Sequence, residues 1–191
     1  MRDEITRAFD ASLRAKKSFL EANLDKLIAV IELIAGALKR GNKLMLFGNG
    51  GSAADAQHIA AEFVNRYRIE RPPLAALALT TDSSALTSIA NDYDYREVFA
   101  KQLRALGKQG DVALGISTSG NSPSVVEALA ACKALKIVSV ALTGGDGGKL
   151  ASVADYVLAV PGTTDTARIQ ETHILIGHVI CEMVDRKLFP G

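Results

Sequence analysis

The feature that most constrains the fold of this chain is a set of short apolar runs, most of which do not alternate with polar residues. The five runs follow the first 40 residues and lie at 43–48, 74–79, 112–117, 137–142 and 156–160. A strand with one face toward solvent alternates apolar and polar residues, whereas a strand of a parallel sheet covered by helices on both faces is apolar throughout. The runs therefore predict a doubly wound α/β fold.

Helical patterns surround these runs. Apolar residues at spacings of three and four predict an amphipathic helix over about 2–20. A second helix, from near Asn23 to before Gly41, would form a helical hairpin with the first. Two more helices are predicted over 52–67, directly after the first strand, and over about 167–187.

The length of the chain limits how many domains it can form, and its net charge limits which partners it can bind. At 191 residues, with no linker, we expect one domain over 1–191, with N-terminal helices at 1–40 and an α/β core at 41–191. The formal net charge of +1 offers no basic field for nucleic acid or an acidic membrane, so neither partner is expected.

The cysteines and the N-terminal residues indicate in which cell compartment the protein is expected. Cys132 and Cys181 lie in apolar helical contexts and match neither a metal-binding spacing nor a disulfide framework. The first residues show no basic-then-apolar leader, and no apolar stretch is long enough to span a bilayer. We therefore expect a cytoplasmic protein.

Two loops that follow predicted strands are rich in glycine and hydroxyl groups. Gly48–Ser52 opens a helix after the first run, where backbone N–H groups and the helix dipole can face an anion. Ser117–Ser122 follows the third run and supplies four hydroxyl groups. Because ligands bind at the carboxyl ends of parallel strands, the two loops predict a phosphate monoester site. Each loop alone could also be ordinary turn and N-cap chemistry.

Two nucleotide-binding patterns fit less well. A loose GxGxxA pattern begins at Gly48, but the acidic residue roughly 20 positions on is Glu70, which precedes the second strand instead of ending it. Gly148-Lys149 lacks the upstream glycine of a P-loop. A nucleotide site is therefore the weaker interpretation of the glycine-rich loops.

Histidine and carboxylate side chains form a second constellation. His58 and Glu62 project from one face of a mostly apolar helix, where an ionised glutamate needs a partner, although such a pair is often only a surface contact. In the last predicted helix, Gln170 and His178 lie within about 80° of each other, whereas His173 points elsewhere. Side chains from the two helices could hold a metal ion, with zinc the leading candidate. The alternative is that His173 and His178 are satisfied helix histidines.

The segments GNGGSAADAQHIAAEF, IAND, GISTSGNSP, ALTGGDGG and ARIQETHILIGH together resemble the sedoheptulose 7-phosphate isomerase (phosphoheptose isomerase) family over nearly the whole chain. The resemblance implies the sugar isomerase (SIS) fold. This is a Rossmann-like, three-layer α/β/α sandwich with a five-stranded parallel sheet, here preceded by the helical hairpin. It also implies a homotetramer packed partly through the N-terminal helices, which would bury the apolar stripe from Ile5 to Leu20.

The resemblance further implies an activity, namely conversion of sedoheptulose 7-phosphate to D-glycero-D-manno-heptose 7-phosphate through a cis-enediol, the first step toward the ADP-heptose of lipopolysaccharide core. It implies one Zn²⁺ per subunit held by His58, Glu62, Gln170 and His178. Because the isomerisation needs a base at carbon and an acid for the oxygens, we predict that Glu62 and His178 are the catalytic pair. The implied substrate contacts are Asn49, Gly50, Gly51, Ser52, Glu62, Asn91, Asp92, Ser117, Thr118, Ser119, Ser122 and Gln170.

Two relatives of the same fold offer other functions. A DnaA-associating branch acts in replication initiation and lacks the counterparts of Glu62 and His178, both of which are present here. A non-catalytic SIS protein would bind a sugar phosphate without converting it. Some of the isomerases carry an aspartate where this chain has Ala167, with Asp165 two residues earlier, which leaves the role of an acid in that loop open.

Overall fold

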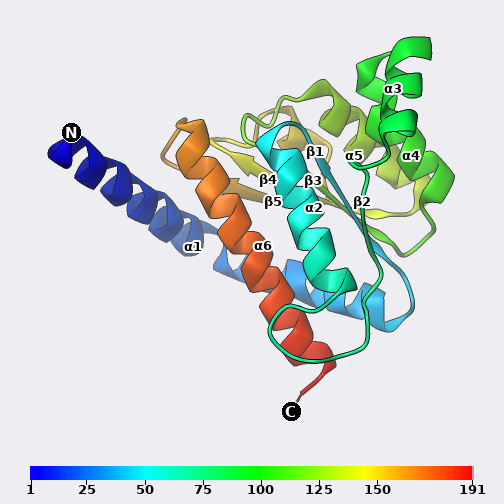
Figure 1. Ribbon diagram of the computed structural model, residues 1–191, viewed down its shortest axis with the longest axis horizontal. Coiled ribbons are helices and arrows are strands. Elements are labelled where there is room, and N and C mark those ends of the chain that lie inside the picture. Colours follow the sequence, from blue (N-terminus) through cyan, green and yellow to red (C-terminus); the bar gives the residue numbers. More distant parts are fainter. Residues whose placement is uncertain (191) are drawn as a thin grey trace.

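The computed structural model describes residues 1–190, which form one parallel sheet flanked by helices (Figure 1). The elements in chain order are α1 (Arg2–Lys39), β1 (Leu44–Gly48), α2 (Gly51–Val64), β2 (Ala76–Ala78), α3 (Ser83–Asp92), a 3₁₀ turn (Tyr95–Glu97), α4 (Val98–Leu106), β3 (Val112–Ser117), α5 (Pro123–Leu135), β4 (Val138–Gly144), a second 3₁₀ turn (Gly148–Ser152), β5 (Tyr156–Val160) and α6 (Thr166–Leu188). The strands run parallel in the order β2-β1-β3-β4-β5. The predicted α/β fold with a five-stranded sheet is confirmed.

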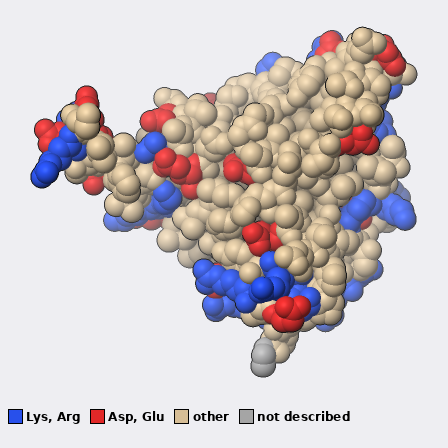
Figure 2. All heavy atoms as spheres, viewed as in Figure 1, with Lys and Arg blue, Asp and Glu red and all other residues tan. Residues whose placement is uncertain are grey.

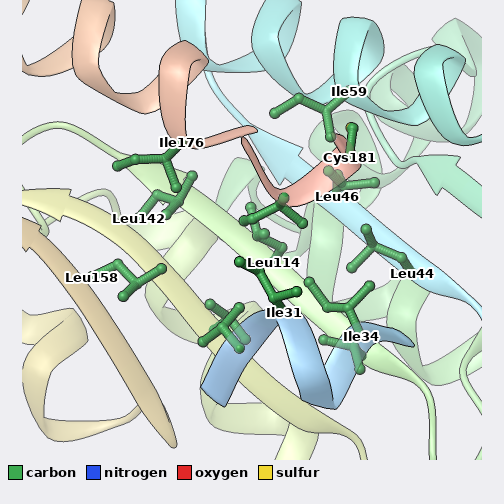
Figure 3. Close-up of a cluster of buried hydrophobic side chains, with 14 of the residues drawn as sticks. Ile31, Ile34, Leu44, Leu46, Ile59, Leu114, Leu142, Leu158, Ile176 and Cys181 are labelled. Atoms are coloured by element: carbon green, nitrogen blue, oxygen red, sulfur yellow. The ribbon is translucent and has the colours of Figure 1, made fainter. Parts of the chain in front are cut away.

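The sheet separates two hydrophobic clusters. Leu44 and Leu46 of β1 face a cluster built with α1, α2 and α6, part of which is shown in Figure 3. Met45 and Phe47, the alternate residues of the same strand, face a cluster built with α4 and α5. This two-sided burial is why the central strands do not alternate in the sequence. The two edge strands are less buried, with only Ala78 of the three residues of β2 and only Leu158 and Val160 of the five residues of β5 buried.

The predicted N-terminal hairpin is wrong, because α1 is a single helix of 38 residues. The chain between the two predicted helices contains no glycine or proline to end the first one. Asn23, taken as a helix start, lies inside α1 and is buried. Its Nδ2 donates to the carbonyl of Phe19 at 3.2 Å and to that of Ala159 in β5 at 2.9 Å, so it docks the helix on the sheet.

The strand order creates a switch point between β1 and β3. From β1 the chain moves to β2 on one side, whereas β3 to β5 extend on the other side. Gly48, the last residue of β1, lies in register with Ile116 near the end of β3. The two loops predicted to bind phosphate therefore leave the sheet side by side at the position where ligands bind in such folds.

Candidate active site

Asn49 joins the two strand-end loops. Its Nδ2 donates to the hydroxyl oxygens of Ser122 at 2.8 Å and Ser124 at 3.0 Å, both beyond the end of β3. Its Oδ1 accepts a hydrogen bond of 2.8 Å from the hydroxyl group of Tyr95. The glycine and serine loops thus form one polar surface. Tyr95 and Ser124 were not predicted, and only Ser124 had a signal in the sequence, its position two residues after Ser122.

The serine loop leads into α5. Ser117 is buried at the end of β3, Thr118 is half-buried and Ser119 is exposed. Ser122 is the N-cap of α5, but its hydroxyl group makes no capping hydrogen bond, which leaves it facing Asn49. The positive end of the α5 dipole therefore lies beside several hydroxyl groups, an arrangement that suits a phosphate.

The glycine loop brings in a residue from α6. Gly50 is the N-cap of α2, with a φ of 56°, and the buried Ser52 lies in the first turn. A Cβ added at Gly51 would lie 1.8 Å from Nε2 of Gln170, so a glycine is needed for Gln170 to approach. Gln170 thus contacts the start of the same helix that carries His58.

The predicted catalytic side chains meet between α2 and α6. Nε2 of His58 lies 2.8 Å from Nε2 of His178, and the two rings pack edge to face with centroids 5.0 Å apart. Oε1 of Glu62 lies 3.5 Å from Nε2 of His58. The side chain of Glu62 is 21% exposed, so its carboxylate is accessible to a ligand and to water. A carboxylate and two imidazoles, the groups needed for proton transfer, are therefore assembled from residues 120 positions apart.

The fit of these residues to a metal ion is partial. Two imidazole nitrogens and a carboxylate are ligands that zinc prefers. However, no group of three or more histidine, cysteine, aspartate or glutamate side chains within residues 1–190 is arranged to hold a metal ion. Gln170 lies against Gly51 at the opposite end of α2 from Glu62. The donor types fit zinc, and the four-residue ligand set stays a prediction.

Asn91 and Asp92 come from a different helix than the histidine pair. Both are exposed at the end of α3, where Nδ2 of Asn91 donates to Oδ1 of Asp92 at 2.9 Å. Among the hydrogen bonds of the described residues, none joins either side chain to the strand-end loops or to Glu62. Their role as substrate contacts stays a prediction.

Tyr67 was not predicted as part of this site. Its ring stacks on the ring of His178, with centroids 5.5 Å apart and planes 18° from parallel. The guanidinium of Arg68 lies 5.3 Å from the centroid of the Tyr67 ring. Tyr67 follows the end of α2, and nothing in its sequence spacing relates it to His178.

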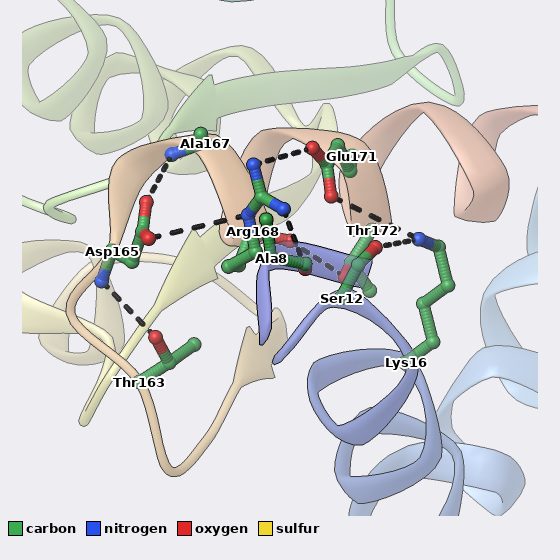
Figure 4. A network of polar contacts seen from close by, with 9 residues as sticks. All are labelled: Ala8, Ser12, Lys16, Thr163, Asp165, Ala167, Arg168, Glu171 and Thr172. Carbon is green, nitrogen blue, oxygen red and sulfur yellow. Dashed lines mark hydrogen bonds and ion pairs between the residues drawn. The ribbon is translucent and has the colours of Figure 1, made fainter. Parts of the chain in front are cut away.

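Asp165 serves a structural purpose (Figure 4). Its side chain accepts a hydrogen bond from the backbone N–H of Ala167 at 2.9 Å and caps α6. Within the next turn, Arg168 donates to the carbonyl of Ala8 in α1 at 2.8 Å and pairs with Glu171 at 2.8 Å. These contacts fix the start of α6, where Gln170 lies, against α1.

His173 lies away from the site, as predicted. It is fully buried, and its Nε2 lies 2.9 Å from the carbonyl oxygen of Thr143, to which the neutral ring can donate. Burial lowers the pKa of His173 from 6.5 to about 4, a shift that the Thr143 contact opposes.

The pKa of His173 predicts how stability depends on pH. The unfolded chain binds a proton at this residue below pH 6.5, whereas the folded chain does so only near pH 4. Between these two pH values only the unfolded chain binds the proton. The free energy of unfolding should therefore be highest above pH 6.5 and fall by about 3 kcal/mol as the pH falls toward 4. Urea unfolding of the wild type and of His173→Gln across this range should give curves that converge at low pH. Parallel curves would contradict the assignment.

The fold and the loop pair define the class of protein. The model of the SIS domain family matches residues 9–144. The chain therefore belongs to the SIS domain family, as the sequence segments predicted.

Comparison with individual proteins shows to which members of the SIS domain family the chain is similar. The chain is 53% identical to the phosphoheptose isomerase of Thermodesulfovibrio yellowstonii over 187 residues, which cover 98% of this chain and 92% of that protein. Among solved structures, phosphoheptose isomerase GmhA from Neisseria gonorrhoeae is 46% identical, with a TM-score of 0.90 over 96% of this chain and 98% of that chain. A phosphoheptose isomerase from Francisella tularensis is 37% identical, with a TM-score of 0.92 over 96% and 97%. Within the SIS family, the chain belongs with the phosphoheptose isomerases.

Proposed function

We propose that this chain is an aldose–ketose isomerase that converts sedoheptulose 7-phosphate to D-glycero-D-manno-heptose 7-phosphate. Its similarity to phosphoheptose isomerases extends over nearly its whole length. The observation that carries the proposal is the cluster of Glu62, His58 and His178, assembled from two helices. The phosphate group would bind at the serine loop, beside the first turn of α5.

The reaction moves one proton from C1 to C2 of the sugar and another from O1 to O2, through a cis-enediol. In our proposal Glu62 accepts the proton from C1 and then delivers a proton to C2, while His178 moves the proton between the two oxygens. Because 21% of the Glu62 side chain is exposed, a proton held on its carboxylate can exchange with water before it is delivered. Gln170, held against the glycine loop, would orient the sugar between the two helices.

We also propose that the enzyme uses one Zn²⁺ per subunit, held by His58, Glu62, Gln170 and His178. When bound, the ion would supply electrophilic stabilisation of the oxygen that becomes negatively charged. Dialysis against a chelator should lower turnover by at least about 100-fold, and added Zn²⁺ should restore it. Full activity of protein shown by elemental analysis to be metal-free would contradict the zinc proposal while leaving the isomerase proposal standing.

We further propose a homotetramer in which a second copy covers α1. Residues along the first half of this helix are apolar and exposed, among them Ile5 (54%), Phe9 (70%) and Leu13 (64%). An apolar groove continues between α1 and α6, lined by Leu20, Leu24 and Leu175 among others. Figure 2 shows few charged atoms over the middle of the face on which α2 and α6 lie. Sedimentation equilibrium would test the assembly.

The cellular setting is part of the proposal. Both cysteines are free and buried, and burial raises the pKa of each thiol to about 12, which suits a reducing cytoplasm. No helix within residues 1–190 is long and apolar enough to cross a membrane. The product would enter the route to ADP-heptose for lipopolysaccharide core.

One experiment separates the isomerase from its alternatives. Purified protein is incubated with sedoheptulose 7-phosphate, with and without added Zn²⁺, and aldose formation is followed by NMR. The proposal expects the aldose to accumulate to equilibrium. Saturable binding without product under any metal condition would indicate a sugar-phosphate-binding protein. Neither binding nor product, together with capture of DnaA, would indicate a replication-initiation partner.

A further inference from the structure

Arg71 lies in the segment between α2 and β2, and its guanidinium is buried, with 1% of the side chain exposed. Its NH2 nitrogen donates to the carbonyl of Glu62 at 2.9 Å, and NH1 donates to the carbonyl of Phe63 at 2.8 Å. NH1 also lies 3.2 Å from the carbonyl of Asn65. The last carbonyls of a helix lack intrahelical partners, and a cation there complements the dipole. Arg71 therefore caps the end of α2 that carries Glu62.

The same side chain reaches across to α6. Nε of Arg71 donates to Oδ1 of Asp185 at 2.8 Å, and the Asp185 side chain is only 4% exposed. Asp185 lies seven residues, or about two turns, after His178 on α6. One guanidinium thus bonds to the backbone of Glu62 and to the helix that carries His178.

The two helices also touch directly at a point between the residues of the candidate site. A Cβ added at Gly177 would lie 2.4 Å from Cδ1 of Ile59, so α2 and α6 touch where the histidines meet. Apolar side chains of both helices also pack in one buried cluster, a contact that lacks the directional geometry of a hydrogen bond. The Arg71–Asp185 pair adds a hydrogen-bonded contact near the C-terminal ends of both helices, beyond Glu62 and His178.

We propose that Arg71 and Asp185 are positioning residues, a clamp that sets the separation of Glu62 from His178 for proton transfer. The inference rests on the proposed function. Stability alone is a poor explanation, because a buried ion pair is often no more stabilising than apolar residues of similar volume. The second carboxylate oxygen of Asp185 is buried without a hydrogen-bond partner, which adds to the cost of placing this acid here. A displacement of about 1 Å at a reacting group costs roughly 100-fold in rate, and the clamp prevents one.

A second buried carboxylate provides a matched control. Asp111 is 1% exposed, pairs with Lys43, and accepts a hydrogen bond from the backbone N–H of Lys108 at 2.8 Å. It precedes β3, so it lies at the opposite edge of the sheet from the strand-end loops. Loss of its charge should destabilise the fold without changing the geometry between α2 and α6.

The test compares Asp185→Asn with Asp111→Asn, each assayed well below its own Tm with sedoheptulose 7-phosphate. In Asp185→Asn, kcat should fall by about tenfold or more while KM stays within about threefold. Asp111→Asn should keep the wild-type kcat despite a similar fall in Tm. If Asp185→Asn does not fold, Arg71→Lys takes its place, since the lysine ammonium cannot bridge Glu62 and Asp185 at once.

A second readout does not depend on turnover. The chain has three histidines, so the imidazole signals of His58 and His178 can be assigned by NMR through single substitutions in metal-free protein. These signals should shift in Asp185→Asn and stay in place in Asp111→Asn. Wild-type signals and kcat in Asp185→Asn would overturn the clamp, as would equal losses of kcat in both variants. A wild type that makes no aldose would instead refute the proposed function, and the NMR comparison would still test the clamp.

Discussion

Glu62→Gln should lower kcat for sedoheptulose 7-phosphate by at least about two orders of magnitude with the fold intact. Glutamine has nearly the same shape but cannot accept the proton from C1, and a general base contributes roughly 10²–10⁴ in rate. His178→Gln should lose a similar factor, since it removes the group that moves protons between the sugar oxygens. Steady-state kinetics of each variant measures the loss of kcat, and circular dichroism shows whether the fold is intact.

Glu97→Gln is the matched control for this loss. The side chain of Glu97 is 29% exposed, against 21% for Glu62, and it pairs with Arg104 at 2.7 Å instead of with a histidine. It should keep wild-type turnover. Near-normal kcat in Glu62→Gln or in His178→Gln would refute the catalytic assignment of that residue.

Gly120→Ala should destabilise the protein by about 3 kcal/mol or more and raise KM for the sugar phosphate. Gly120 has a φ of +66°, and an added Cβ would lie 2.1 Å from the carbonyl oxygen of Gly147, which is backbone and cannot turn away. The carbonyl of Gly120 also accepts a hydrogen bond from Leu150. The serine loop must therefore move, and the phosphate site moves with it.

Gly145→Ala is the control that separates the effect of the close contact made by the added Cβ from the effect of the left-handed backbone conformation. Gly145 has a similar φ of +60°, but an added Cβ there would meet no atom within 4 Å. This variant should lose only about 1–2 kcal/mol, the cost of a left-handed conformation. Urea unfolding of both variants provides the comparison, and equal losses would contradict the argument from close contact.

The sheet could be predicted from the sequence because burial on both faces leaves a continuous apolar run. The runs at 112–117 and 156–160 coincide with β3 and β5. The hairpin prediction failed because Asn23 favours helix starts in general, yet here its amide bonds to the sheet from within one helix. A helix was expected after the serine loop, where α5 lies, but without bounds. Helices α3 and α4 were not predicted, and α3 buries none of its residues fully, so its apolar face is weak in the sequence.

The site was predicted in part. Helical spacing placed His58 with Glu62 on one face, but the contact of His58 with His178 depends on how α2 packs on α6. The glycine and serine loops are local patterns, and parallel strands bring them together by topology alone. Arg71 and Asp185 are 114 residues apart and carry no motif, so only the folded structure relates them.

The most direct test of the central claim is isomerisation of sedoheptulose 7-phosphate in D₂O, followed by ¹H and ²H NMR. Proton transfer through Glu62 predicts that the aldose carries solvent deuterium at C2, because a proton held on a carboxylate exchanges with water. Glu62→Gln should give neither product nor deuterium incorporation. An aldose that keeps only the hydrogen of the substrate at C2, or no aldose at all from the wild type, would contradict the account.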